Sequence, residues 1–591
     1  MTVAASFCAT LVDEWIRAGL TDAVVAPGSR STPLALALAR EERIALHVRF
    51  DERSAAFFAV GIAMATNRPA VLVTTSATAA AEVHAAVVEA HLSRVPLIVC
   101  TADRPWELHH VGAPQTIEQA GLFQGAVRWA VDPGVPSGET RSSWRSLASR
   151  LVAEATAGPM GPGPVHANLA FREPLIAEPG ELPKGRGNGQ PWHRVATVRR
   201  MLEPGVLDSL VGVLRPSARG LIIAGAGAGR TENVRRLAAK LGWPVLADPR
   251  SGARVPGEEG APTVAAADAC LRVESFAASH VPEVVFHLGQ TWASRVVGEF
   301  LDSAADAGAV QVHIDPHWCW RDPGRKADLV LPADPDLVMD AVCSREIAGG
   351  APDRSTARAP SVWSEGWAEA EAVAQHAITR VLAGHPEVTE PGLARVLFAW
   401  LPAGSTVVAS SSMPVRDLEW FAVPRSDPPR VLANRGANGI DGVTSTTLGV
   451  TAAAGGTGGH VVGLLGDLAF LHDASALFRG RREPVLPAVL VVVDNGGGGI
   501  FSFLPQAEEL EEGHFERLFG TPQKVDVAEL ARAAGCETIE VGARDEIPGQ
   551  LDEGLSRAAR RGPAVVVVRT DRRANVKVHA ELEAEVAIAL A

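Results

Sequence analysis

The chain has 591 residues, too many for one hydrophobic core, and 47% hydrophobic with 21% charged residues is an ordinary globular composition. A formal net charge of −13 argues against a nucleic-acid-binding protein, which would present a basic face. No apolar run reaches the roughly 18 residues of a membrane span, and the N-terminus lacks the cationic segment of a secretion signal. With six scattered cysteines, we expect reduced thiols, a cytoplasmic location and no membrane insertion.

Short β-branched segments alternate with Ala- and Leu-rich segments, which predicts α/β domains with parallel sheets. In the first part of the chain, strands are expected within 22–28, 44–50, 69–75 and 95–103. Glu52 lies just after the second of these strands and at the start of a helical segment. An acidic residue at that position usually caps the helix or interacts with its dipole, so alone it would indicate only structure.

The Pro- and Gly-rich stretch 178–192 and a polar stretch near residue 355 divide the chain into three predicted doubly wound units, 1–185, 192–350 and 356–591. The middle unit is expected to hold strands within 218–227, 243–249, 284–289 and 309–316. Its segment GAGAGR (Gly225–Arg230) is similar to a dinucleotide-binding fingerprint but lacks the G-x-G-x-x-G spacing. A tight strand–helix turn is therefore the favoured interpretation.

The last unit is expected to hold strands within 405–412, 429–436, 460–467, 488–495 and 563–570, and two of them end on polar residues. Asn495 stands 28 residues after Asp467, a spacing at which a strand–helix–strand crossover would bring the two strand ends together. A carboxylate, a carboxamide and glycine carbonyls suit Mg²⁺, and the glycine amides would receive phosphates. Asp-Asn-Gly is also common turn chemistry, but the pairing with Asp467 favours a metal–diphosphate site.

Together, GDL (Gly466–Leu468), the Asp-Asn pair and Glu52 resemble the GDG…NN signature and the activating glutamate of thiamine-diphosphate enzymes. Four further segments closely resemble one family among them, the 2-succinyl-5-enolpyruvyl-6-hydroxy-3-cyclohexene-1-carboxylate synthases of menaquinone biosynthesis: APGSRSTPLALAL (Ala26–Leu38), VGAPQTIEQAGLF (Val111–Phe123), SSSMPVRD (Ser410–Asp417) and NRGANGIDG (Asn434–Gly442). The resemblance implies the three-domain fold of thiamine-diphosphate enzymes. Ala77 departs from the family, which usually has Gly there.

The resemblance also implies the cofactors thiamine diphosphate and Mg²⁺, or Mn²⁺ in its place. Glu52 would be the catalytic residue that activates the aminopyrimidine ring. Side-chain ligation by Asn495 is preferred to Asp494, because Asn495 fills the second position of the NN pair. Asp467, Asn495 and Gly497 would bind the metal. The implied cofactor-binding residues are Gln115, Ile440, Gly466, Asp467, Leu468, Asn495, Gly497, Ile500, Phe501 and Leu504. For Ile440 and the apolar residues after the glycines, ordinary core packing is the alternative.

The implied reaction decarboxylates 2-oxoglutarate and adds the resulting succinyl carbanion to isochorismate, so the enzyme would be a transferase. Each substrate carries two carboxylates, which requires a basic pocket. Arg295 rests on a looser match, and a surface salt bridge is its equal alternative. The implied substrate-binding residues are Ser29, Arg30, Arg104, Gln115, Arg295, Ser412, Arg416 and Arg435.

Three other functions compete with this hypothesis. One is another thiamine-diphosphate 2-oxoacid lyase or synthase, such as acetolactate synthase, which would need fewer arginines. Another is a binding protein that has lost the chemistry, although such a protein would have no reason to keep Glu52, Asp467 and Asn495 together. The third, a dinucleotide-dependent oxidoreductase, rests only on GAGAGR. In thiamine-diphosphate enzymes Glu52 and Asp467 would meet across a subunit interface, so the resemblance implies a homodimer or homotetramer.

Overall fold

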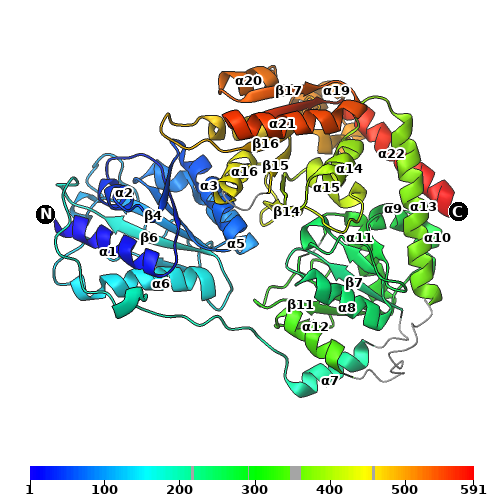
Figure 1. Ribbon diagram of the computed structural model, residues 1–591, viewed down its shortest axis with the longest axis horizontal. Helices are drawn as coiled ribbons and strands as arrows, with labels where there is room; N and C mark the ends of the chain where they lie inside the picture. Colours follow the sequence, from blue (N-terminus) through cyan, green and yellow to red (C-terminus); the bar gives the residue numbers. More distant parts are fainter. Residues whose placement is uncertain (215–218, 291, 346–360, 455–458) are drawn as a thin grey trace.

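The computed structural model describes residues 1–214, 219–290, 292–345, 361–454 and 459–591, and its strands form three parallel six-stranded sheets (Figure 1). We name the domains built around them N-terminal, middle and C-terminal. The sheets span 22–170, 220–331 and 406–569, each inside one predicted unit. The predicted boundary between 350 and 356 lies outside the described residues. The α/β fold class with three doubly wound sheets is therefore confirmed.

The N-terminal sheet has the strand order β2-β1-β3-β4-β6-β5. Its central strands β3 and β4 are buried along their whole length, because helices cover both faces. The strands are β1 (Asp22–Val25), β2 (Ala45–Val48), β3 (Ala70–Thr74), β4 (Leu97–Asp103), β5 (Trp129–Val131) and β6 (Pro164–Ala170). The helices are α1 (Val3–Arg17), α2 (Thr32–Ala39), α3 (Glu52–Thr66), α4 (Thr78–Glu82), α5 (His84–Ser93) and α6 (Trp144–Ala157).

The middle sheet has the order β12-β11-β10-β7-β8-β9, which is the strand order of dinucleotide-binding domains. Its strands are β7 (Gly220–Ala224), β8 (Val245–Ala247), β9 (Thr263–Val264), β10 (Val284–Leu288), β11 (Val310–Ile314) and β12 (Leu329–Leu331). Its helices are α7 (Pro204–Val213), α8 (Thr231–Leu241), α9 (Ala267–Leu271), α10 (Glu274–Ser279), α11 (Arg295–Asp306) and α12 (Pro335–Ser344). The preceding segment, residues 171–203, crosses from the N-terminal domain to the far end of this domain (Figure 1).

The C-terminal sheet has the order β14-β13-β15-β16-β18-β17, which repeats the order of the N-terminal sheet. Its strands are β13 (Thr406–Ala409), β14 (Arg430–Ala433), β15 (Val461–Gly466), β16 (Ala488–Asp494), β17 (Glu537–Val541) and β18 (Ala564–Arg569). Its helices are α13 (Val362–Gly384), α14 (Glu390–Trp400), α15 (Met413–Phe421), α16 (Val443–Ala453), α17 (Asp467–His472), α18 (Gln506–Glu509), α19 (Glu512–Phe515), α20 (Val527–Ala533), α21 (Ile547–Arg561) and α22 (Arg572–Leu590). Five short or polar strands were not expected from the sequence: β5, β6, β9, β12 and β17.

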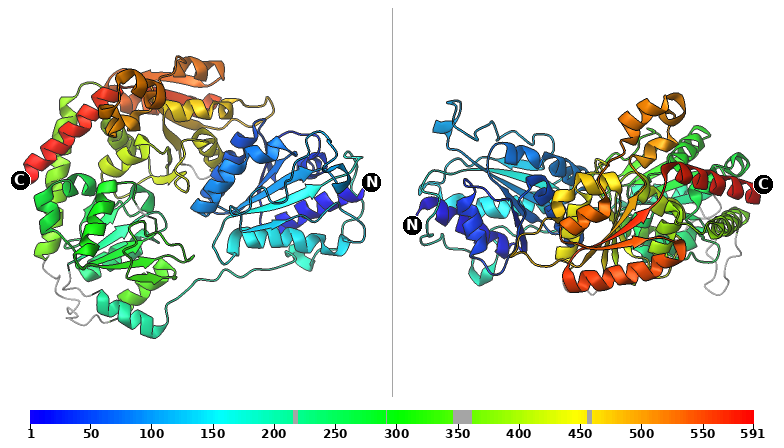
Figure 2. Two further views of the ribbon diagram at one scale, coloured as in Figure 1. Left: turned by 180° about the vertical axis from the view of Figure 1, so that it is seen from behind. Right: turned by 90° about the horizontal axis from the view of Figure 1, so that it is seen from above.

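The N-terminal and C-terminal domains meet along helices α3 and α16, which bury a shared apolar cluster containing Phe57, Phe58 and Leu448. Two glycines allow the helices to touch backbone to backbone. A Cβ on Gly61 would lie 2.2 Å from the carbonyl oxygen of Thr446, and one on Gly449 would lie 2.0 Å from that of Phe58. The contact therefore fixes how these two domains sit against each other. Figure 2 shows them from behind and from above, with the chain ends at opposite ends of the molecule.

Candidate active site

A cavity of about 400 Å³ lies in the C-terminal domain at the carboxyl ends of β13, β15 and β16. In doubly wound sheets this edge is where ligands bind. Eleven of the predicted site residues line the cavity, and we call them the C-terminal half-site: Ser412, Arg416, Arg435, Ile440, Gly466, Asp467, Leu468, Asn495, Gly497, Ile500 and Phe501. Leu504 is not among the lining residues and is 37% exposed.

Asp467 holds the glycine-rich loop by hydrogen bonds. The amide of Leu468 donates to its Oδ1 at 2.7 Å, and the amide of Gly497 donates to its Oδ2 at 2.6 Å. Burial of the side chain, to which the nearby Asp494 adds, raises the pKa of Asp467 to about 6. A divalent cation beside this carboxylate would favour its charged form. Gly497 has φ +129°, and a Cβ there would meet the carbonyl oxygen of Gly520 at 2.0 Å, so the loop requires glycine at this position.

The Asn495 carboxamide has one satisfied end and one unsatisfied end. Its Nδ2 donates to Oε1 of Glu390 at 2.9 Å, whereas its Oδ1 is buried without a partner in the structure. A buried acceptor left unpaired costs free energy that a ligand would recover. Asp494, in contrast, pairs with Arg569 at 3.1 Å and does not line the cavity. The oxygen atoms of Asp467 and Asn495 therefore fit a hard cation, and this geometry supports Asn495 over Asp494.

Two arginines of this half-site, Arg416 and Arg435, bring positive charge to the cavity. Arg416 donates to the carbonyl oxygen of Ser412 at 2.7 Å. Burial lowers the pKa of Arg435 to about 10, with the charges of Arg250 and Arg416 adding to the effect. Ser412 has φ +74° and ψ −136°, a backbone conformation that is costly for any residue but glycine and that recurs at ligand sites. The guanidinium groups and the strained turn together suit an anionic substrate.

Five of the other predicted residues lie in loops and at a helix start beside the carboxyl edge of the N-terminal sheet. Arg104 donates to Oε1 of Gln115 at 3.2 Å and also to the hydroxyl of Ser76. Arg30 donates to the carbonyl oxygen of Phe171 at 2.9 Å, and its charge adds to the burial that lowers the pKa of Arg104. Two such guanidinium groups in one place favour an anion between them. We call the following set the N-terminal half-site: Ser29, Arg30, Glu52, Arg104 and Gln115.

Glu52 is the first residue of α3, behind the N-cap Asp51, whose side chain accepts from the amide of Ser54. Burial raises the pKa of the Glu52 carboxyl, to which the neighbouring acids Asp51 and Glu82 add. No residue of the N-terminal domain lines the C-terminal cavity within the described part of the chain. One chain thus carries two half-sites, one with Glu52 and one with Asp467 and Asn495.

Arg295 is not brought to either half-site. It lies at the start of α11 in the middle domain and borders a separate cavity of about 270 Å³. Its side chain is 86% exposed and pairs with Glu299 at 3.1 Å. Substrate binding by Arg295 remains a prediction.

The GAGAGR turn of the middle domain is filled by a side chain of the same chain. One oxygen of Asp336 accepts from the amide of Arg230 at 2.8 Å and from the side chain of Asn233 at 2.8 Å. A Cβ on Gly229 would lie 2.8 Å from the same oxygen. The carboxylate of Asp336 thus takes the place at the start of α8 where a pyrophosphate would bind, and it occupies the amide of Arg230, which supports the tight-turn interpretation.

Two functional features were not expected from the sequence. Glu390 borders the cavity and holds Asn495, but a glutamate at the start of a helix is common and carries no signal. The second feature is Ser76, whose hydroxyl accepts from Arg104. It lies next to Ala77, and no motif in the sequence distinguishes it. Elsewhere, all six cysteines are free thiols. None of the helices in the described ranges is long and apolar enough to cross a membrane.

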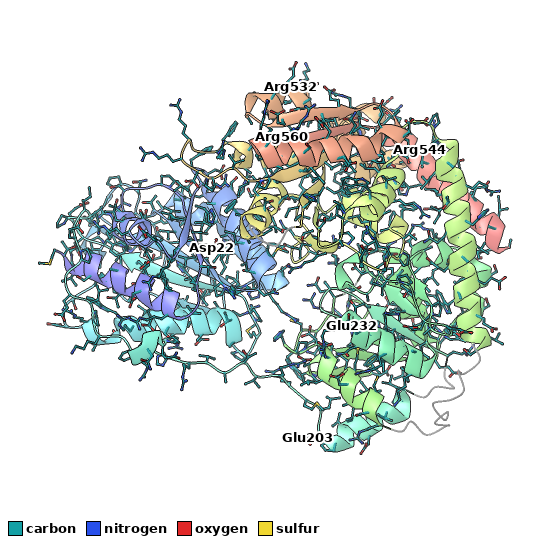
Figure 3. The ribbon with its side chains drawn as sticks, in the orientation of Figure 1. Asp22, Glu203, Glu232, Arg532, Arg544 and Arg560 are labelled. Atoms are coloured by element: carbon teal, nitrogen blue, oxygen red, sulfur yellow. The ribbon has the colours of Figure 1, made fainter. Side chains whose placement is uncertain are left out.

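The outer edge of the C-terminal domain carries paired rather than clustered charge. Figure 3 shows Arg532, Arg544 and Arg560 there, along the upper edge of the domain in this view. Arg532 pairs with Glu540 at 2.8 Å, and Arg544 donates to the carbonyl oxygen of Leu382 at 2.7 Å. This edge therefore resembles an ordinary solvated surface, in contrast to the two basic half-sites.

Comparisons with known proteins give first the class and then the family. Residues 1–122 match the N-terminal TPP binding domain of thiamine pyrophosphate enzymes, and residues 419–568 match the C-terminal one. The fold is similar to a crystal structure of benzoylformate decarboxylase from Polynucleobacter necessarius, with a TM-score of 0.69 and 17% identity over 96% of this chain and 98% of that one. The fold, the half-sites and these domains define a thiamine-diphosphate enzyme.

Relatives at higher sequence identity show which family of thiamine-diphosphate enzymes the chain belongs to. The 2-succinyl-5-enolpyruvyl-6-hydroxy-3-cyclohexene-1-carboxylate synthase of Thermobifida fusca is 43% identical over the whole of both chains. Those of Chloroflexus aurantiacus and Myxococcus xanthus are 41% and 40% identical, over 97% and 98% of this chain and 94% and 97% of theirs. The chain belongs to this synthase family.

Proposed function

We propose that this enzyme decarboxylates 2-oxoglutarate and transfers the succinyl group to isochorismate, giving 2-succinyl-5-enolpyruvyl-6-hydroxy-3-cyclohexene-1-carboxylate and CO₂ in menaquinone biosynthesis. The observation that carries the proposal is the composition of the C-terminal cavity. It combines metal-ligand oxygens from Asp467 and Asn495 with the guanidinium groups of Arg416 and Arg435. A cofactor diphosphate and a dicarboxylate substrate need these two kinds of group side by side.

Thiamine diphosphate, when bound, supplies a thiazolium carbon that adds to 2-oxo acids and accepts the electron pair left by CO₂. Asp467, Asn495 and the carbonyl of Gly497 would hold Mg²⁺ or Mn²⁺ on its diphosphate. Gly466 and Leu468 would shape the floor beneath the phosphates, and Ile440, Ile500 and Phe501 would exclude water from the rings. Glu52 would hold a proton against the aminopyrimidine nitrogen. The raised pKa of its carboxyl matches such a role.

The substrate carboxylates would be bound from both half-sites. Arg416 and Arg435 would serve from one side, and Ser29, Arg30, Arg104 and Gln115 from the other. Because Glu52 does not line its own chain's C-terminal cavity, we propose that a second copy of the chain completes each active site. The enzyme would then act as a homodimer or a homotetramer in the cytoplasm.

The direct test incubates the purified protein with isochorismate, 2-oxoglutarate, thiamine diphosphate and Mg²⁺, and follows isochorismate by its ultraviolet absorbance. We expect the absorbance to fall only when all four components are present. Turnover of pyruvate without loss of isochorismate would contradict the proposal and would favour an acetolactate-synthase-like enzyme.

A further inference from the structure

The loop of residues 434–439 (NRGANG) carries Arg435 between two anchored backbone segments. Before Arg435, the buried Asn434 side chain donates to the hydroxyl of Thr446 at 3.2 Å. After Arg435, the amides of Gly436 and Ala437 are held from the N-terminal domain. Arg435, between these anchors, lines the C-terminal cavity.

The second anchor is the carboxylate of Glu89 in α5, which is 2% exposed. Gly436 donates to its Oε1 at 2.9 Å, and Ala437 donates to its Oε2 at 2.8 Å. The hydroxyl of Ser93 also donates to Oε1, at 2.5 Å. Both side-chain oxygens of Glu89 are therefore committed to the loop backbone, one to each of two consecutive amides. The contact joins positions 347 apart in the chain and two different domains.

The loop lies directly against α5, without room for adjustment. A Cβ on Gly436 would lie 2.8 Å from the carbonyl oxygen of Glu89 and 2.8 Å from Cβ of Leu92. These distances are too short for any other residue, so the absence of a side chain at Gly436 allows the carboxylate to reach two consecutive amides. The backbone beside Arg435 is therefore fixed by geometry as well as by hydrogen bonds.

Similar contacts elsewhere in the protein provide a comparison. Glu371 in α13 accepts from the consecutive amides of Ala265 and Ala266 at 2.9 and 2.8 Å. Those two amides border neither half-site. A buried glutamate that holds two amides can thus have a purely structural role. A substitution at Glu371 therefore serves as the control for the structural effect of losing such a contact.

We infer that Glu89 is a positioning residue for substrate binding: by holding the amides of Gly436 and Ala437, it aims the guanidinium group of Arg435 at a substrate carboxylate. The inference rests on the proposed function of the C-terminal half-site. It assigns to the N-terminal domain of the same chain a part in substrate recognition, in addition to the N-terminal half-site.

The test uses Glu89→Gln, which keeps the shape but turns an NH₂ group toward one of the two amides. We expect kcat/KM to fall at least about tenfold for the substrate whose carboxylate Arg435 binds, mainly through KM, as for loss of a hydrogen bond to a charged group. In an Arg435→Ala background the same change should cost less than about twofold, because a residue that acts through Arg435 has nothing left to position. Unchanged kcat/KM for both substrates, or a full tenfold loss in the Arg435→Ala background, would overturn the inference.

Hydrogen exchange provides a readout that does not need turnover. In Glu89→Gln the amides of the 434–440 segment should exchange faster than in the wild type, and an unchanged rate would contradict the anchoring role. The control Glu371→Gln should speed exchange around Ala265 and leave kcat/KM unchanged. If the wild type itself turns over neither substrate, the proposed function fails; if it does and Glu89→Gln behaves like the wild type, only this inference fails.

Discussion

At the scale of single residues, the Asn495 side chain has its Nδ2 in a hydrogen bond and its Oδ1 without a partner. Glu390 fixes the amide nitrogen, and the free Oδ1 is left for a cation. We therefore predict that Asn495→Ala raises the Mg²⁺ concentration needed for half-maximal cofactor binding about tenfold or more, as loss of a metal ligand or its support does. Tryptophan fluorescence during a Mg²⁺ titration measures this. The control Asp494→Asn, at the neighbour that pairs with Arg569, should leave the midpoint close to that of the wild type.

Substitution of Glu52 should affect turnover without affecting the binding of the cofactor. Its carboxyl lies outside the cavity that would hold the diphosphate, so Glu52→Gln should abolish turnover while the affinity for thiamine diphosphate and Mg²⁺ stays within about threefold of the wild type. Calorimetric titration alongside the absorbance assay tests both parts. A fully active variant would show that Glu52 is not the activating carboxylate.

Ala77 adopts a backbone conformation that suits glycine, with φ +70° and ψ −127°. Its amide donates to Oε1 of Gln119 at 2.6 Å, which holds the strained turn in place. Ala77→Gly should relieve strain of about 1–3 kcal/mol and lose up to about 1 kcal/mol to the greater freedom of the unfolded chain. We expect a higher melting temperature in a thermal scan; a clearly lower one would mean that the Ala77 side chain contributes more packing than strain.

At the scale of elements, the sequence predicted those strands that are continuous apolar runs. The strand β6 was missed because His166 and Asn168 interrupt its apolar pattern, although it is buried throughout. Both side chains are satisfied by partners on other segments: His166 meets Thr101 at 2.7 Å, and Asn168 donates to Asp103 at 2.8 Å. A single sequence does not reveal such distant partners. The short strands β9 and β12 were missed because two or three residues show no pattern.

The buried His166 in β6 should make the stability of the fold depend on pH. Burial lowers its pKa to about 4, below the value of about 6.5 expected in the unfolded chain. The folded state therefore binds fewer protons between these values, and the contribution of His166 to stability is lost as the pH falls from about 6.5 toward 4. His166→Gln should remove this dependence. Melting temperatures of both proteins measured across that range should converge, or cross, at the acid end; a constant difference would contradict the assignment.

Because a single sequence does not reveal partners that are distant in the chain, only some parts of the site could be predicted. Asp467, Asn495 and the glycines stand in one local pattern, and Arg30, Arg416 and Arg435 stand inside motifs that resemble a family. Glu89 and Glu390 stand in no pattern, because each acts on a loop 347 or 105 positions away. In the sequence, helical glutamates of this kind cannot be distinguished from solvated surface residues. Only the folded structure shows their partners.

At the scale of the whole molecule, the two half-sites predict complementation between inactive variants. Glu52→Gln and Asp467→Ala each remove one half. In a mixed dimer, however, one site receives an intact Glu52 from one chain and an intact Asp467 from the other. Random mixing should therefore restore about a quarter of wild-type activity, since half of the dimers are mixed and each has one working site. Co-expression with two affinity tags tests this, because the doubly purified dimers are all mixed and should show about half of wild-type activity, with one working site of two. No recovery would favour sites built within one chain.

The glycine contact between α3 and α16 has a consequence for how substrates enter. Because Gly61 and Gly449 bring backbone against backbone, no side chain at these two positions can adjust to a sliding motion, and we expect the N-terminal and C-terminal domains of one chain to move together. Entry and product release then depend on smaller parts, such as the turn at Ser412 and the short helices after the glycine-rich loop. Turnover in this enzyme should accordingly respond to the stiffness of these loops, and hardly at all to hinge motion between the two domains.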